Sequence, residues 1–173
     1  MSAQEKVRLG IAGCGATRVM FGVILRLVEN GVLVAAMDPE VQRAEEMRKK
    51  YGARQVFADY DEFLDKADID AVIIGSPVYL HAEQVVKAAE AGKHILCEKP
   101  MARTIGECDL MLEACRKHGV KLMVGLMKRF DKSMQYAAEL IRNGTLGEVV
   151  QIISDWSCYS SGRRQGWRVA LET

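Results

Sequence analysis

Two closely spaced glycines, Gly13 and Gly15, follow the first apolar run of the chain. Glycine suits a tight turn at the first position, and at the second it leaves space for a phosphate because it has no side chain. A helix that starts after such a turn directs its free N–H groups and the positive end of its dipole at the anion. We therefore predict a diphosphate-binding turn made of Gly13, Cys14, Gly15, Ala16, Thr17 and Arg18.

The turn departs from the fingerprint G-x-G-x-x-G at its third glycine, where this chain has Arg18. That glycine normally lets the helix lie close to the sheet. Gly22 follows one turn later on the same helical face, and we expect it to restore the close approach. Arg18 would then extend toward phosphate or solvent.

An acidic residue, Asp38, ends the second apolar run at the distance from the glycines that is typical of a ribose-binding acid. Its carboxylate would bind both ribose hydroxyls and repel a 2′-phosphate, so the expected cofactor is NAD, with NADP as the less favoured possibility. The alternative role is an N-cap for the helix that begins with Pro39. One side chain can serve in both roles.

Polar residues also follow two later apolar runs. The first group is Ser76-Pro77 with His81 four residues after the proline, and the second is Glu98-Lys99-Pro100. Open α/β sheets bind ligands at the carboxyl ends of their strands, so both groups are candidate site residues. An ammonium at Lys99 would hydrogen-bond a substrate hydroxyl and stabilise developing alkoxide during hydride transfer. The alternative for Glu98-Lys99-Pro100 is an exposed Glu–Lys pair in a surface loop.

The elements that would position these residues alternate along the chain. Short β-rich apolar runs predict strands at Val7–Ala12, Val32–Met37, Gln55–Phe57, Ala71–Ile74, His94–Cys97 and Lys121–Val124. Helical periodicity and end signals predict helices at Thr17–Asn30, Pro39–Tyr51, Val78–Ala91 and Thr104–His118. Parallel strands need such crossovers, which are right-handed almost without exception. We therefore predict an α/β fold, a doubly wound parallel sheet of the Rossmann type with strand order 3-2-1-4-5-6.

The pattern changes after about Phe130. We predict a helix over Lys132–Arg142 and, from the alternation of apolar and polar residues, an antiparallel-type strand over Glu148–Ser157. A lone strand does not complete a sheet. We therefore interpret residues 1–125 as the dinucleotide-binding domain and residues 126–173 as the beginning of an incomplete α+β second domain. The open edge of the lone strand predicts self-association.

Composition restricts the classes of function. The chain has 173 residues, of which 49% are hydrophobic, and a formal net charge of +1, so no strong field would attract nucleic acid or an anionic membrane. Its apolar runs are too short to span a bilayer, and its N-terminus lacks the features of a signal peptide. Three scattered histidines predict no metal site, and five cysteines without CxxC spacing are expected to be reduced thiols in a cytoplasmic protein.

Several of these motifs together resemble, in order and spacing, the family of glucose–fructose oxidoreductase, inositol dehydrogenase and MocA-like proteins (Gfo/Idh/MocA). The resemblance covers nearly the whole chain, and the run Ala91–Pro100 is its most specific part. The other motifs that carry it are Gly13-Cys14-Gly15, Asp38-Pro39, Ser76-Pro77 through His81, Arg129-Phe130 and Gly147-Glu148-Val149.

The resemblance implies a NAD(P)-dependent oxidoreductase that transfers hydride to or from a carbinol carbon of a sugar, cyclitol or related polyol. It implies that Glu98-Lys99-Pro100 lies near the nicotinamide and that Lys99 contacts substrate and assists proton transfer. It also implies that Ser76, Pro77 and His81 line the cofactor cleft. Val78 departs from the family, which often has Asn after this proline.

The resemblance further implies that residues 126–173 open a domain for substrate binding and oligomerisation. The family's Asp and His motif in that domain, which holds the expected general acid/base, would lie beyond Thr173. We therefore expect the chain by itself to bind NAD with little or no turnover.

Two other functions stay open on the sequence. A non-catalytic dinucleotide-binding module or pseudoenzyme would need Gly13, Gly15 and Asp38 but not Glu98-Lys99-Pro100. A Rossmann-like methyltransferase also has a glycine-rich first loop and an acid after its second strand, but there Lys99 would have no role.

Overall fold

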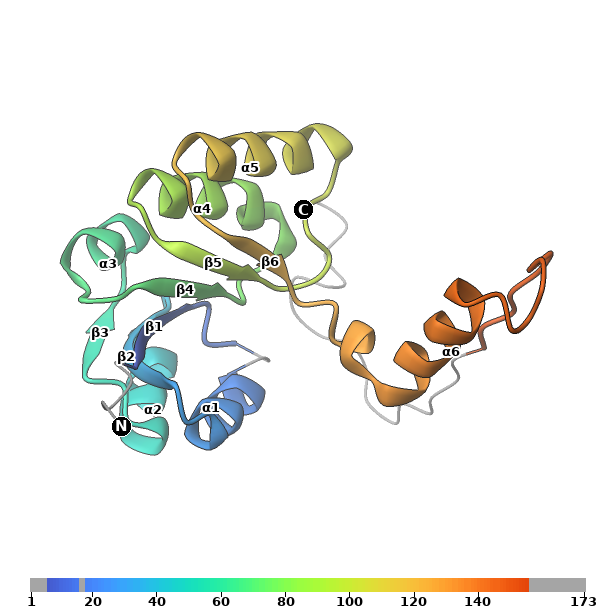
Figure 1. Ribbon diagram of the computed structural model, residues 1–173. Coiled ribbons are helices and arrows are strands. Elements are labelled where there is room, and N and C mark those ends of the chain that lie inside the picture. Colours follow the sequence, from blue (N-terminus) through green and yellow to red (C-terminus); the bar gives the residue numbers. More distant parts are fainter. Residues whose placement is uncertain (1–5, 16–17, 156–173) are drawn as a thin grey trace. The chain divides into compact units, whose positions relative to one another are not determined.

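The computed structural model describes residues 6–15 and 18–155. Within these ranges a single six-stranded parallel sheet has the order β3-β2-β1-β4-β5-β6 (Figure 1). The predicted α/β fold and its strand order are confirmed, and each predicted strand ends within one residue of the observed one. The strands are β1 (Val7–Ala12), β2 (Gly31–Met37), β3 (Gln55–Phe57), β4 (Ala71–Ile74), β5 (His94–Cys97) and β6 (Leu122–Val124).

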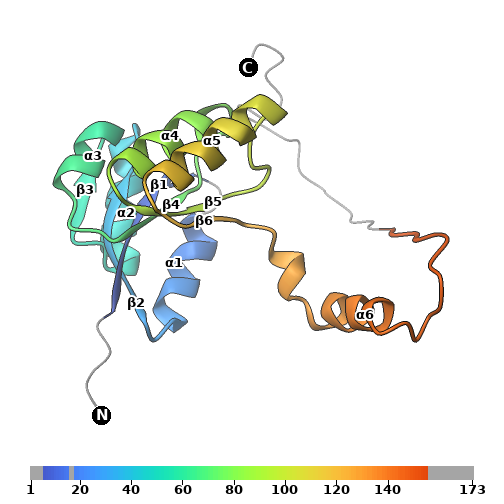
Figure 2. The same ribbon diagram turned by 45° about the horizontal axis from the view of Figure 1, so that its top comes forward.

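Helices cover both faces of the sheet (Figures 1 and 2). The two views place α1 and α2 on one face and α3, α4 and α5 on the other. This arrangement buries the central strands on both sides, which explains why Gly31–Met37 and Ala71–Ile74 are nearly continuous apolar runs. The helices are α1 (Arg18–Leu27), α2 (Val41–Tyr51), α3 (Tyr60–Lys66), α4 (Val78–Glu90) and α5 (Ile105–Lys117).

Two hydrophobic cores lie on the opposite faces. Phe21 of α1 and Met47 of α2 belong to one core, whereas Phe63 of α3 and Met111 of α5 belong to the other. Successive residues of a strand face opposite sides of a sheet. Accordingly, the residues of β4 contribute to the two cores in alternation along Val72–Ile74.

Helix α3 was missed by the sequence analysis. Its N-cap is Asp59, whose carboxylate accepts a hydrogen bond of 2.8 Å from the Glu62 amide. Two further acids, Asp61 and Glu62, stand in the first turn, where their negative charges interact favourably with the positive end of the helix dipole. An Asp followed by acids is a recognisable helix start, but the helix has only 7 residues and too few turns to show a period.

Helix α2 begins later than predicted. It starts at Val41 with Glu40 as its N-cap, not at Pro39. The reason is the carboxylate of Asp38, which accepts a hydrogen bond of 2.9 Å from the Glu40 amide and closes a local turn before the helix. Asp38 is therefore not the N-cap of this helix.

The chain divides into two units after Gly125. In the second unit, a 3-10 turn (Met127–Phe130) precedes α6 (Lys132–Arg142), which has the predicted bounds. The predicted strand Glu148–Ser157 is wrong over residues 148–155, which form no strand in the structure; residues 156 and 157 lie outside the described ranges. A strand exists only when it pairs with another, and no described segment pairs with this one.

Residues 148–155 thus offer no open strand edge of the kind on which self-association was predicted. Self-association itself stays a prediction. The described helices include none that is both long and apolar enough to cross a bilayer.

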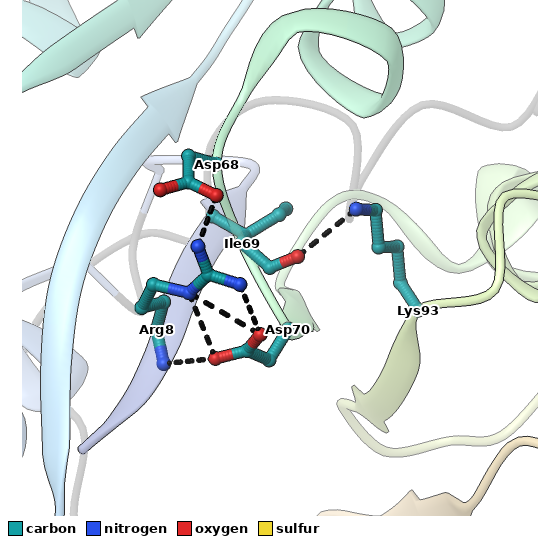
Figure 3. Close-up of polar contacts among 5 residues, drawn as sticks. All are labelled: Arg8, Asp68, Ile69, Asp70 and Lys93. Carbon is teal, nitrogen blue, oxygen red and sulfur yellow. Dashed lines mark hydrogen bonds and ion pairs between the residues drawn. The ribbon is translucent and has the colours of Figure 1, made fainter. Parts of the chain in front are cut away.

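An ion-pair cluster joins the amino ends of β1 and β4 (Figure 3). The Arg8 guanidinium forms ion pairs with Asp68 and Asp70, and the Asp70 carboxylate also accepts the Arg8 backbone amide at 2.7 Å. Lys93 donates to the carbonyl oxygen of Ile69 in the same segment at 3.0 Å. These contacts anchor the loop before β4 at the edge of the sheet opposite to the carboxyl ends of the strands.

We expect the Arg8–Asp70 pair to make stability pH-dependent. The hydrogen bonds from Arg8 lower the pKa of Asp70 from 3.8 to about 2. The pair therefore stabilises the fold fully at pH values above 3.8, and this stabilisation is lost as the pH falls from there to about 2. Asp70→Asn should therefore remove this part of the acid dependence in urea unfolding. At neutral pH it should lower the free energy of unfolding by about 1 kcal/mol or less, because solvent screens exposed ion pairs.

Glu62→Gln is the matched control, because it removes an exposed carboxylate whose partner, the exposed Lys66 ammonium, lies on the same helix. It should change the acid dependence less than Asp70→Asn does, because both members of the Glu62–Lys66 pair are exposed. An Asp70→Asn variant with the acid dependence of the wild type would contradict the prediction.

Candidate functional site

The parallel register brings the carboxyl ends of the central strands to one level. Ala12 is paired with both Met37 of β2 and Ile74 of β4, and Ile74 is paired with Cys97 of β5. The backbone amides that follow continue the ladder: Gly13 donates to Met37 at 2.9 Å, and Glu98 donates to Ile74 at 2.9 Å. The candidate residues after β1, β2, β4 and β5 therefore lie along one edge of the sheet.

The turn after β1 requires glycine at its first position. Gly13 has a φ of +88°, and a Cβ there would lie 2.4 Å from the Ser76 amide nitrogen. This close approach packs the turn after β1 against the turn after β4. At Gly15 a Cβ would meet no described heavy atom within 4 Å, so the backbone there is open.

Asp38 joins the turn after β1 to the turn after β2. Its side chain is buried, with 5% exposure, and its two oxygens accept separate backbone amides, from Cys14 at 2.8 Å and from Glu40 at 2.9 Å. A buried carboxylate needs such donors because its desolvation is costly. The Cys14 side chain is fully buried and contacts the Met37 carbonyl at 3.5 Å, so the outward-facing part of the turn is backbone.

A small polar network supports the turn after β4. The Ser76 hydroxyl donates to the side-chain oxygen of Gln84, and the Tyr60 hydroxyl donates to the Gln84 carbonyl at 2.8 Å. Burial raises the pKa of Tyr60, so this phenol stays a neutral donor. Sequence reasoning missed both Tyr60 and Gln84. Gln84 is a polar residue one turn after His81 on the buried face of α4, a break in the apolar pattern that was a usable signal.

His81 is buried with 1% exposure and connects the two later loops. Its Nε2 atom lies 3.0 Å from the Ser76 carbonyl oxygen, and its Nδ1 atom lies 3.0 Å from the Pro100 carbonyl oxygen. Each ring nitrogen faces a carbonyl, so the ring donates to at least one of the two turns. The geometry makes His81 a bridge beneath the site surface.

Glu98 and Lys99 have opposite environments at the end of β5. Glu98 is buried, with 7% exposure, and its carboxylate accepts the Lys99 amide at 3.0 Å. The Lys99 side chain is exposed. Burial, together with the neighbouring Glu98 carboxylate, raises the pKa of Cys97 to about 12, so its thiol is not a nucleophile at neutral pH.

A pocket of about 430 Å³ opens at this edge of the sheet. Gly13, Asp38, Ser76 and Pro77, all singled out in the sequence, line it. Charged residues that were not singled out line it as well: Glu40, Arg43, Asp59, Asp61, Glu83 and Lys87.

Several sequence-predicted residues lie elsewhere. The lining of the pocket does not include Cys14, Gly15, His81, Glu98 or Lys99. Ala16 and Thr17, and the side chain of Arg18, lie outside the described part of the chain. The expectation that Gly22 allows a close approach of α1 to the sheet is wrong. A Cβ at Gly22 would lie 2.5 Å from the Tyr51 ring, so this glycine lets α1 approach α2.

Comparison with known proteins agrees with this geometry. Residues 7–126 match the family model Gfo/Idh/MocA, described as an oxidoreductase family with an NAD-binding Rossmann fold. The chain belongs to this family. The predicted resemblance is thus confirmed, and residues 7–126 form an NAD-binding Rossmann domain.

Curated relatives extend the match. The chain is 37% identical over 165 residues to a 2,7-anhydro-N-acetylneuraminate hydratase of Mediterraneibacter gnavus, covering 94% of the chain and 41% of the relative. It is 32% identical over 142 residues to a myo-inositol 2-dehydrogenase of Thermotoga maritima, covering 82% of the chain and 42% of the relative. The chain therefore spans about two fifths of the length of these relatives.

A solved structure gives the same picture. Scyllo-inositol dehydrogenase from Lactobacillus casei, with bound NAD(H) and scyllo-inositol, matches with a TM-score of 0.79 and 32% identity. The match covers 83% of this chain and 43% of that one.

We expect His81 to hold the two loops together. His81→Leu keeps most of the volume but leaves the Ser76 and Pro100 carbonyl oxygens without their ring partner. Loss of a buried hydrogen-bond partner costs about 1–3 kcal/mol, which urea unfolding would detect. His118→Leu, at an exposed position after α5, is the control and should change stability less. Equal losses in both variants would refute the bridging role.

Proposed function

We propose that the chain binds NAD at the carboxyl edge of the sheet and serves an enzyme that transfers hydride to or from a carbinol carbon. The proposed substrate is a sugar, cyclitol or related polyol. The observation that carries the proposal is the geometry of the turn Gly13–Gly15 together with the buried carboxylate of Asp38, which accepts a hydrogen bond from the Cys14 amide of that turn.

The residues present fit a dinucleotide. Gly15 has open space where a side chain would block a diphosphate, and α1 follows with its N-terminal amides toward the same turn. Asp38 would hold the ribose hydroxyls through the carboxylate that now accepts backbone amides. The acidic lining of the pocket disfavours a further phosphate, which supports NAD over NADP.

Glu98 and Lys99 would serve the reacting end. Bound NAD supplies the hydride acceptor, and NADH the donor. The exposed Lys99 ammonium would hydrogen-bond the substrate oxygen and, in the direction of carbonyl reduction, donate a proton to it. Glu98 accepts the Lys99 backbone amide and so orients the residue that carries this ammonium.

The proposed substrate class rests on similarity to two inositol dehydrogenases. A second candidate is a hydratase acting on an anhydro sugar acid, favoured by the 37% identity to a protein of that name over 94% of this chain. The two differ in net redox change. A dehydrogenase accumulates NADH with a polyol, whereas a hydratase converts its substrate without net NADH.

Calorimetric titration with NAD, NADH and NADP tests the cofactor directly. We expect NAD to bind more tightly than NADP, and Gly15→Ala to abolish NAD binding while stability is retained, because the new methyl enters only the ligand's space. Gly106→Ala, at another open glycine on α5, is the control and should bind NAD normally. Absent NAD binding in the wild type, or preferential binding of S-adenosylmethionine, would overturn the proposal.

Lys99→Ala separates the enzyme from a non-catalytic module. In the chain we expect NAD affinity to change by less than about threefold, because the exposed Lys99 side chain is proposed to contact the substrate and not the cofactor. The corresponding substitution in a complete family member should abolish turnover with polyol. Unchanged turnover there would favour the non-catalytic module for this motif.

A further inference from the structure

The pocket carries more negative than positive charge. Five carboxylate residues and two cationic residues line it: Asp38, Glu40, Asp59, Asp61 and Glu83 against Arg43 and Lys87. Acids therefore outnumber the two cations. Whether the pocket can accept an additional anion depends on the ion pairs that each cation already forms.

Lys87 is held by two carboxylates. Its ammonium lies 2.9 Å from Asp61 and 3.0 Å from Glu83. Removal of either acid would leave the other in place, so Lys87 is a poor candidate for receiving a phosphate.

Arg43 is held by a single partner in the described structure, Glu40. The guanidinium lies 2.8 Å from the Glu40 carboxylate, and both residues stand at the first turn of α2, directly after Asp38. Asp38 accepts the Glu40 amide, so the ribose-binding candidate and this ion pair share one local turn. The pair is therefore placed to contact the 2′-substituent of a ribose that is held by Asp38.

We propose that Arg43 is a masked ligand for a 2′-phosphate and that Glu40 is the specificity-determining residue that masks it. This inference rests on the proposed binding of NAD. A guanidinium is well suited to a phosphate because its N–H groups form a planar fork. Glu40 occupies that fork and adds a second negative charge beside Asp38, so a cofactor with a free 2′-hydroxyl is preferred.

The charge of Glu40 matters more than the strength of its ion pair. Glu40 is 65% exposed and Arg43 43% exposed, and pairs of this kind contribute little to stability. A phosphate dianion could displace the carboxylate from the arginine, but the carboxylate would stay close and repel it. Removing one such charge at a wetted surface changes the affinity for a dianion by roughly tenfold.

The test measures NAD and NADP affinity by calorimetry in Glu40→Gln, alone and combined with Asp38→Ser. We expect Glu40→Gln to shift the ratio of the two affinities toward NADP by about tenfold in either background. Adding Arg43→Ala should cancel the shift, and higher salt should reduce it. The single variant keeps Asp38, so it stays informative if Asp38→Ser does not fold.

Glu45→Gln is the matched control. Glu45 pairs with Arg48 on the same helix with the same spacing of three residues, but neither residue lines the pocket. Its affinity ratio should equal that of the wild type. If Glu40→Gln behaves like Glu45→Gln, or if the shift survives Arg43→Ala, the inference is overturned while NAD binding stands. If the wild type binds no NAD, the proposed function fails first.

Discussion

The buried carboxylate of Asp38 is the interaction on which the candidate site depends. One oxygen accepts the Cys14 amide and the other accepts the Glu40 amide, so a single side chain fixes two turns that come from different strands. A carboxylate at 5% exposure is stable only with such donors. Because these donors are backbone amides, the turns must keep their conformation for the carboxylate to remain satisfied.

The polar side chains at the two edges of the sheet make different kinds of contact. At the amino edge, Arg8 and Asp70 satisfy each other in an ion pair. At the carboxyl edge, polar groups serve the backbone of turns, as in the contacts of His81 with Ser76 and Pro100. Such contacts shape an open surface without filling it, which is what a binding site requires.

The successes and failures of sequence reasoning follow from the range of the forces involved. The central strands β2 and β4 were predictable because burial on both faces of the sheet selects nearly continuous apolar runs. Helix α3 was missed because its 7 residues are too few for a period. The predicted strand was wrong over residues 148–155 because alternation shows that a segment could pair but does not provide its partner.

The sequence by itself determined the six strands, the glycine turn and the acid after β2, because these depend on local backbone freedom and on hydrophobic periodicity. Only the tertiary structure decided what each side chain touches. It placed Gly22 against Tyr51 instead of the sheet, placed His81 beneath the site, and brought Tyr60 and Gln84 to Ser76. These contacts join residues from separate elements, and packing in three dimensions selects them in a way that no local pattern records.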